Sequence, residues 1–146
     1  MVSIKKTIVI NRSLQEVFDF ASNPTNAPKW QSGIKSKRWI SEEPPGIGSK
    51  QKVVARWLGR DIETINEYTI WDPPNGYRFK TSNGPMRLEE GLHFVQEAEG
   101  TRVNFALQIE ARGIFKLAEG LLKNQAEKTS PTYLQALKRF LESGSD

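Results

Sequence analysis

Glu90 and His93 are the side chains of this sequence best suited to acid–base chemistry, and the pattern around them separates their positions. Glu90 occurs at an even position within a segment of alternating character, together with the apolar residues Met86, Leu88, Leu92 and Phe94. Successive side chains of a strand point to opposite faces. We therefore expect Glu90 to be buried on the apolar face and His93 to face solvent.

Two roles for Glu90 stay open at this point. A buried carboxyl loses hydration, which raises its pKa and suits it to act as a hydrogen-bond acceptor, an acid or a base on a bound molecule. Alternatively, Glu90 is a structural carboxyl at a strand end, or it pairs with an inward arginine such as Arg38, whose face the pattern does not fix.

Several other kinds of chemistry are excluded by composition. The chain has one His and no Cys, which removes disulfides, thiol catalysis and metal sites built from Cys or several His. Gly46-Ile47-Gly48 begins like a dinucleotide-binding motif, but Gln51 stands where that motif needs Gly and the segment joins two predicted strands. We read it as a turn and expect no metal and no cofactor.

The charge is basic, with 21 Lys and Arg against 17 Asp and Glu and a formal net charge of +4. Seven basic residues crowd the predicted second to fourth strands: Lys35, Lys37, Arg38, Lys50, Lys52, Arg56 and Arg60. No outward aromatic run accompanies them, so we expect a solvated basic face and no nucleic-acid binding. An acidic ligand, a membrane surface or an acidic partner stays open.

The elements that would position Glu90 begin with a β-branched strand ending at Ile10. Ser13 and Glu16 have the spacing of a capping box, so a helix should start at Ser13. It should end at Asn23-Pro24, because the residue before proline avoids the helical region. A short second helix is expected over residues 25–30.

Residues 34–110 predict six antiparallel strands separated by Gly, Pro and Asn turns. In the third of these strands, alternation places Ile62, Thr64, Asn66, Tyr68 and Ile70 on the inner face. From Ile114 to Glu142 the apolar period becomes helical, and we expect the segment Ile114–Ala126 to dock against the sheet. Pro131 either kinks one long helix or begins a second helix that Ser130 caps.

This order of elements, together with several short motifs, resembles a known family. The motifs are Ser13-x-x-Glu16-Val17-Phe18, Trp30, Gly46-x-Gly48-Ser49, Gly59-Arg60, Asp72-Pro73-Pro74, Gly100-Thr101-Arg102-Val103 and Leu137-Lys138-Arg139-Phe140-Leu141-Glu142. The chain resembles the polyketide cyclase/dehydrase-like branch of the SRPBCC superfamily, which is related to START lipid-binding domains. The resemblance covers nearly the whole chain, and Pro131 is its main departure.

The resemblance implies an α+β helix-grip (START-like) fold, in which a curved antiparallel sheet wraps around a long C-terminal helix and leaves a hydrophobic cavity. It carries no shared catalytic motif. Strand parity and the helical stripe then give the expected ligand-binding residues, with Glu90 as the catalytic candidate: Trp57, Asn66, Tyr68, Tyr77, Phe79, Leu88, Leu92, Phe94, Phe105, Leu121 and Leu122.

The expected function is binding of a small hydrophobic or aromatic molecule, polyketide-like or lipid-like. Whether the protein is an enzyme stays open. In an enzyme, we expect a cofactor-free cyclisation or dehydration with Glu90 as acid or base and Tyr68 or Asn66 orienting a carbonyl. The alternative is an interaction module with a filled cavity that acts through its basic sheet edge or terminal helix.

Length and hydropathy complete the expectations. A chain of 146 residues is close to the usual size of one domain, so we expect residues 1–146 to form a single domain. Neither a signal peptide nor an apolar run of about 18 residues is present, which favours a soluble, cytoplasmic protein. The sequence does not report the oligomeric state.

Overall fold

The computed structural model describes residues 1–57, 59–81 and 86–143, except for the side chain of Trp57. Within them, seven strands form one antiparallel sheet of order β1-β7-β6-β5-β4-β3-β2. The strands are β1 (Val2–Ile10), β2 (Ile34–Trp39), β3 (Lys50–Trp57), β4 (Arg60–Asp72), β5 (Gly76–Thr81), β6 (Met86–Glu97) and β7 (Gly100–Ala111). The six predicted strands after the first helix are confirmed.

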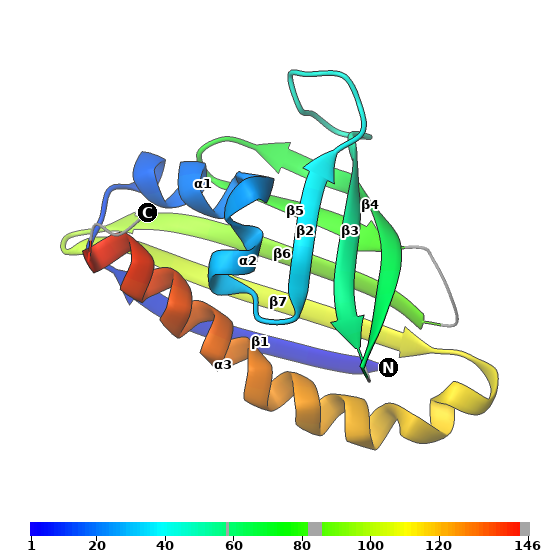
Figure 1. The fold of residues 1–146 in the computed structure, drawn as a ribbon. Helices are drawn as coiled ribbons and strands as arrows, with labels where there is room; N and C mark the ends of the chain where they lie inside the picture. The colour runs from blue at the N-terminus through cyan, green and yellow to red at the C-terminus, as the bar shows by residue number, and fades with distance from the viewer. Residues whose placement is uncertain (58, 82–85, 144–146) are drawn as a thin grey trace.

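The helices gather on one face of this curved sheet (Figure 1). They are α1 (Leu14–Ser22), the 3-10 helix η1 (Pro24–Asn26), α2 (Ala27–Trp30), the 3-10 helix η2 (Gly113–Ala118) and α3 (Glu119–Ser143). The Ser13 hydroxyl accepts a hydrogen bond from the Glu16 backbone N–H at 3.2 Å, which confirms the predicted cap. None of the described helices combines the length and apolarity that crossing a bilayer requires.

A bulge in β4 reverses which side chains of its second half point toward the inner face of the sheet. The pairing of β4 with β5 shifts register between Tyr68 and Ile70. The extra residue reverses the alternation, so Trp71 points inward and Ile70 is exposed. The predicted inner face is therefore wrong at Ile70. Ile62 keeps the inward parity, because the pairing of β3 with β4 is regular, but it is 36% exposed close to the β3–β4 turn.

Pro131 lies inside α3, which is continuous for 25 residues, or about 38 Å at 1.5 Å per residue. The alternative of a second helix that starts there is wrong. Ser130 is buried within the helix instead of capping one. On either side, the Thr129 and Thr132 hydroxyls donate to the carbonyls four residues earlier, at 3.0 and 3.1 Å.

The first part of the predicted helical stripe does not dock on the sheet. Ile114, Leu117 and Leu121 are 79%, 92% and 75% exposed, and the first buried residue of α3 is Ala126. The expectation is therefore wrong for Ile114, Leu117 and Leu121, whereas Leu122 and Ala126 do pack against the core. η2 extends past the end of β7 (Figure 1), and Leu121 lies about 160° around α3 from the buried Leu137, on the outer face of the helix.

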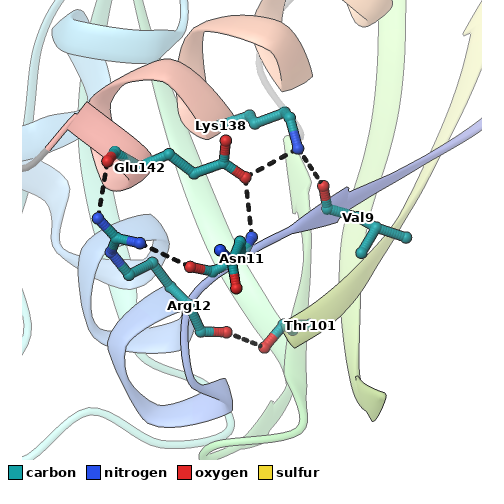
Figure 2. A network of polar contacts seen from close by, with 6 residues as sticks. All are labelled: Val9, Asn11, Arg12, Thr101, Lys138 and Glu142. Carbon is teal, nitrogen blue, oxygen red and sulfur yellow. Dashed lines mark hydrogen bonds and ion pairs between the residues drawn. The ribbon is translucent and has the colours of Figure 1, made fainter. Parts of the chain in front are cut away.

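The other end of α3 is fastened to the junction of β1 and α1 (Figure 2). Glu142 Oε2 accepts from the Asn11 backbone N–H and from Lys138 Nζ, both at 2.8 Å, and Arg12 Nη2 donates to the Glu142 carbonyl at 2.7 Å. Lys138 Nζ also donates to the Val9 carbonyl at 2.6 Å. We call Asn11, Arg12, Lys138 and Glu142 the C-terminal clasp.

Candidate functional site

An aromatic wall lines the inner face of the sheet. Tyr68 is its centre, because its ring lies between 5.2 and 5.8 Å from the rings of four neighbours, Trp39, Trp71, Tyr77 and Phe79. Phe18 of α1 packs edge-on against Trp71 at 5.5 Å. Strands β2, β4 and β5 and helix α1 therefore bring aromatic side chains from distant parts of the sequence to one surface.

Glu90 lies among these rings, as the alternation of β6 predicts. It is 9% exposed, and Gln31 Nε2 donates to Glu90 Oε2 at 3.4 Å. Burial raises the pKa of the Glu90 carboxyl, and the positive charge of Lys37 and the hydrogen bond from Gln31 oppose part of this shift. The carboxyl is thus held closer to its neutral form than a surface glutamate.

Lys37, on β2, is the cation that faces Glu90. Its Nζ lies over the Phe79 ring, 4.7 Å from the centroid. Burial lowers the pKa of the Lys37 ammonium, and the charge of Glu90 opposes that shift. Two expectations need correction here: Lys37 belongs to the inner face instead of the basic surface, and the candidate partner Arg38 is exposed. Alternation on β2 turns the two neighbours to opposite faces.

Gln51 of β3 is a further buried polar residue on this face, and it contacts Tyr68. Tyr68 Oη donates to Gln51 Oε1 at 3.0 Å, and both side chains are fully buried. Gln51 Nε2 has no hydrogen-bond partner among the described residues. Burial, followed by the charge of Glu90, raises the pKa of the Tyr68 hydroxyl well above its usual range. We call Glu90, Gln31, Lys37, Gln51 and Tyr68 the Glu90 cluster.

Two further tyrosines point hydroxyls into the protein near this cluster. Tyr77 Oη donates to the Ala21 carbonyl at 3.1 Å, and Tyr133 Oη of α3 donates to the Ser32 carbonyl at 3.0 Å. Burial raises the pKa of Tyr133 to about 12, with a smaller contribution from the charge of Glu90. Both hydroxyls act as ties between the helices, the sheet and the intervening loops.

The other predicted lining residues divide by exposure. Seven are buried in the structure: Asn66, Tyr68, Tyr77, Phe79, Leu92, Phe94 and Phe105. Leu88 and Leu122 are partly buried against the core. Leu121 is exposed, so its predicted place in the lining is wrong, because it lies about 160° around α3 from the buried Leu137. The side chain of Trp57 lies outside the described residues. These positions give no test of a ligand-binding role.

A pocket opens beside the Glu90 cluster, with a volume of about 580 Å³. Lys37 lies on its wall, and so do Phe18, Trp39 and Trp71 of the aromatic wall. Its remaining lining comes from α1, η1, β2 and the β2–β3 loop: Asp19, Ser22, Asn23, Pro24, Thr25, Arg38, Glu43 and Pro45. We call it the α1–β2 pocket. Lys37 is the member of the Glu90 cluster that lines this pocket, whereas Glu90, Gln31, Gln51 and Tyr68 lie behind its wall.

A second hollow, of about 490 Å³, includes Lys5, Arg78, His93 and Asn104 in its lining. His93 is exposed, as predicted. His93 and Glu90 are an odd number of residues apart on β6, so this hollow opens on the face opposite to the Glu90 cluster. Lys37 and three aromatic residues, Phe18, Trp39 and Trp71, line the first pocket, which makes that pocket the stronger candidate site.

Sequence reasoning missed Gln31, Lys37 and Gln51. A signal for Gln51 exists in the sequence, because it is two residues before the apolar Val53 on the same strand, and Val53 is buried. Lys37 could have been found from Trp39, which is two residues further along β2 and is also directed inward. Gln31 lies in the loop after α2, where no periodic pattern constrains its direction.

A curved antiparallel sheet with helices on one face and a long C-terminal helix defines a START-like helix-grip protein. The sequence agrees with that class, because residues 1–142 match the family described as polyketide cyclase / dehydrase and lipid transport. The chain belongs to this family.

Solved structures share the fold at low sequence identity. A START superfamily protein from Mycobacterium smegmatis has a TM-score of 0.82 at 16% identity, covering 98% of this chain and 99% of the other. A protein from Thermus thermophilus has a TM-score of 0.80 at 23% identity, covering 99% of both chains. No curated protein sequence matches.

A third similar structure is the di-domain ARO/CYC StfQ from the steffimycin biosynthetic pathway. It has a TM-score of 0.79 at 12% identity, and the match covers 99% of this chain and 51% of that chain. The chain therefore spans about half the length of this relative. At such identities the likeness establishes the fold alone.

Proposed function

We propose that this protein binds a small hydrophobic or aromatic molecule, polyketide-like or lipid-like, between the inner face of the sheet and α3. The molecule enters through the α1–β2 pocket, and its polar end meets the Glu90 cluster. The buried Glu90 carboxyl beside Lys37 is the observation that carries the proposal. Burying a charged or unpartnered polar group opposes folding, and such groups gather at functional sites.

The cluster also indicates the chemistry of the ligand. Lys37 presents an ammonium and Gln51 presents a buried N–H donor without a partner among the described residues. Both groups suit an acceptor oxygen, such as a carbonyl or a phenolate. The aromatic wall suits a planar ring system or an alkyl chain. The ligand is therefore an apolar body with at least one oxygen at the inner end.

If the bound molecule is converted, the chain supplies proton transfer without a cofactor, as in a cyclisation or dehydration. Glu90 is the acid or base, because burial raises the pKa of its carboxyl above the usual range and so favours proton exchange with a bound molecule. Tyr68 is less suited to orient a carbonyl, since its hydroxyl already donates to Gln51. Gln51 Nε2 fits that role better. Asn66 Oδ1 accepts from Thr81 Oγ1 at 2.6 Å, so only its amide nitrogen stays available to a ligand.

A fluorescent probe, 1-anilinonaphthalene-8-sulfonate, tests the pocket directly, because its rings suit the aromatic wall and its sulfonate suits Lys37. Ser22 lies on the pocket wall, so Ser22→Phe should fill the space and weaken binding about tenfold or more. Ser3→Phe, on the exposed outer side of β1, is the matched control and should bind like the wild type. Equal binding by all three proteins would contradict the proposal.

Glu90→Gln separates binding from catalysis. We expect the variant to bind the probe with little change and to lose any turnover of the natural ligand. Full activity in Glu90→Gln would remove this residue from the mechanism while leaving the binding proposal intact.

A second function, that of an interaction module, is favoured by the exposed basic residues near the β2 edge of the sheet, including Lys35 and Arg38. Reversing the charge of Lys35 and Arg38 should then abolish binding to a protein partner. Lys37 does not belong in this test because it faces Glu90. The cytoplasmic location and the absence of nucleic-acid binding stay predictions.

A further inference from the structure

The end of the molecule where β7 leads into α3 exposes a group of large apolar side chains. In a 3-10 helix, residues three apart lie on the same side, so Ile114 and Leu117 share one side of η2. Leu121 follows Leu117 by one α-helical turn. Phe115 is also exposed, as is Met1, whose amino group lies 3.2 Å from Glu119 Oε2. We call Met1, Ile114, Phe115, Leu117 and Leu121 the apolar end patch.

This patch is not part of the core. The described residues that pack against the core from α3 start at Leu122, and full burial starts at Ala126. Figure 1 places the N-terminus beside the start of α3, at the same end of the molecule. Clustered exposed apolar side chains of this size mark a surface that contacts another phase or molecule.

Basic side chains surround the patch. Arg112, Lys116 and Lys123 are exposed within the same segment, whereas its one acidic residue, Glu119, is engaged by the N-terminal ammonium. In the antiparallel sheet, β4 and β6 begin at the end where β7 finishes. Arg60 and Arg87 are exposed at this end beside Asp61 and Glu110, respectively, so the excess of positive charge comes from Arg112, Lys116 and Lys123.

We propose that the apolar end patch docks on an anionic lipid bilayer, with η2 and the first turns of α3 lying in the interface. Apolar side chains flanked by cations suit a surface whose interior is apolar and whose headgroups are negative. A second copy of this chain fits less well, because two such patches would bring like charges together. This surface is separate from the α1–β2 pocket and goes beyond the proposed function.

Co-sedimentation with vesicles tests the proposal. We expect the protein to bind vesicles of equal parts phosphatidylcholine and phosphatidylglycerol, and to bind phosphatidylcholine vesicles weakly. Leu117→Ser combined with Leu121→Ser should weaken binding to the anionic vesicles about tenfold or more, because it removes two inserted side chains. The matched control is Ile47→Ser, which changes a 77% exposed side chain in the β2–β3 loop and should have no effect.

The charge contribution is tested separately with Lys116→Gln combined with Lys123→Gln. This variant should bind the anionic vesicles more weakly than the wild type, and its binding should depend less on salt. Each variant must keep the wild-type unfolding temperature, which is expected because all the changed side chains are exposed.

Three results would overturn the proposal. They are no binding to anionic vesicles, binding by the Leu117→Ser/Leu121→Ser variant equal to that of the wild type, or equal binding to anionic and phosphatidylcholine vesicles. Dimerisation that depends on the patch, seen by sedimentation velocity without vesicle binding, would assign the surface to a second copy instead. Failure of the probe experiment in the α1–β2 pocket would leave this proposal untouched.

Discussion

Two features of the surroundings of Glu90 have opposite effects on the pKa of its carboxyl: burial and a nearby cation. Burial raises its pKa, while Lys37 and the hydrogen bond from Gln31 act in the opposite direction. The net result is a buried carboxyl whose pKa is raised above the usual range of a glutamate. Two predictions test this account at the scale of single residues.

The first prediction concerns the pH dependence of stability. A carboxyl whose pKa is raised by folding holds its proton in the native state after the unfolded chain has released it. The free energy of unfolding therefore falls as pH rises from the ordinary value of about 4.5 through the raised pKa of Glu90. Glu90→Gln cannot titrate, so it should lack this fall.

Urea unfolding of the wild type and Glu90→Gln from pH 4 to pH 7 measures the difference. The exposed loop residue Glu42 provides a control, and Glu42→Gln should follow the wild-type profile. Parallel profiles for Glu90→Gln and the wild type would mean that the carboxyl of Glu90 is not desolvated in solution.

The second prediction concerns Lys37. Removing its ammonium takes away the largest influence that lowers the pKa of Glu90, so Lys37→Met should move the Glu90 titration to higher pH. Carboxyl carbon NMR can follow this titration directly. Lys35→Met, on the same strand but paired with Asp61 at the surface at 2.9 Å, should leave it unchanged. A Glu90 titration unaffected by Lys37→Met would contradict the pairing.

Alternation predicted the inward face of Glu90 because β6 is regular around it. The partners were not predictable from that strand, because they come from β2, β3 and the loop after α2. A side chain in a loop, such as Gln31, has no period to reveal its direction. The sequence could thus indicate the carboxyl but not the group of residues that surrounds it.

At the scale of elements, α3 has two unlike halves. Hydrogen bonds of the C-terminal clasp hold its last turns against β1 and α1 (Figure 2). Its first turn is largely exposed, and Glu119 there forms an ion pair with the N-terminal ammonium. We therefore expect substitutions in the clasp to change stability, and substitutions at Leu117 or Leu121 to leave it unchanged.

Glu142→Gln tests the clasp. The backbone N–H of Asn11, together with Lys138, lowers the pKa of the Glu142 carboxyl. A lowered pKa contributes stability above the unfolded value of about 4.5, and that contribution is lost as pH falls through the folded pKa. We expect Glu142→Gln to cost about 1 kcal/mol at neutral pH, less than the roughly 1.5–3 kcal/mol of a buried hydrogen bond to a charged group because solvent reaches this carboxyl, and the difference from the wild type to shrink toward pH 3.

Urea unfolding at both pH values provides the measurement. Glu127→Gln removes an exposed ion pair with Lys6 on the same helix as Glu142 and should cost only a few tenths of a kcal/mol. An equal loss at neutral and acidic pH would show that the carboxylate charge of Glu142 does not hold the clasp.

The order of the elements followed from capping, turn residues and hydrophobic periods, and the Ser13 cap is an example of a local signal that tertiary structure left unchanged. The errors concern the direction of individual side chains within correctly predicted elements. Ile70 changes face because a bulge inserts a residue in β4, an event with no signature in the alternation of that strand. Leu121 is exposed because it lies on the face of α3 opposite the buried Leu137, which a helical wheel of residues 121–137 would have shown.

At the scale of the whole molecule, the fold and the family are established, whereas the ligand is a proposal. The sheet supplies the aromatic wall, α1 and β2 supply the pocket, and β6 supplies the carboxyl, so the site depends on the complete arrangement. That residues 1–146 form a single domain stays a prediction, which a single cooperative unfolding transition would support.

Native mass spectrometry of the freshly purified protein, followed by denaturing extraction, is the most direct test of ligand binding. We predict a bound apolar molecule of a few hundred daltons that carries at least one oxygen, and we predict that Ser22→Phe purifies without it while Ser3→Phe retains it. A bare mass for the wild type, together with no thermal shift from a panel of aromatic and lipid compounds, would contradict the binding function and leave Glu90 as a structural carboxyl.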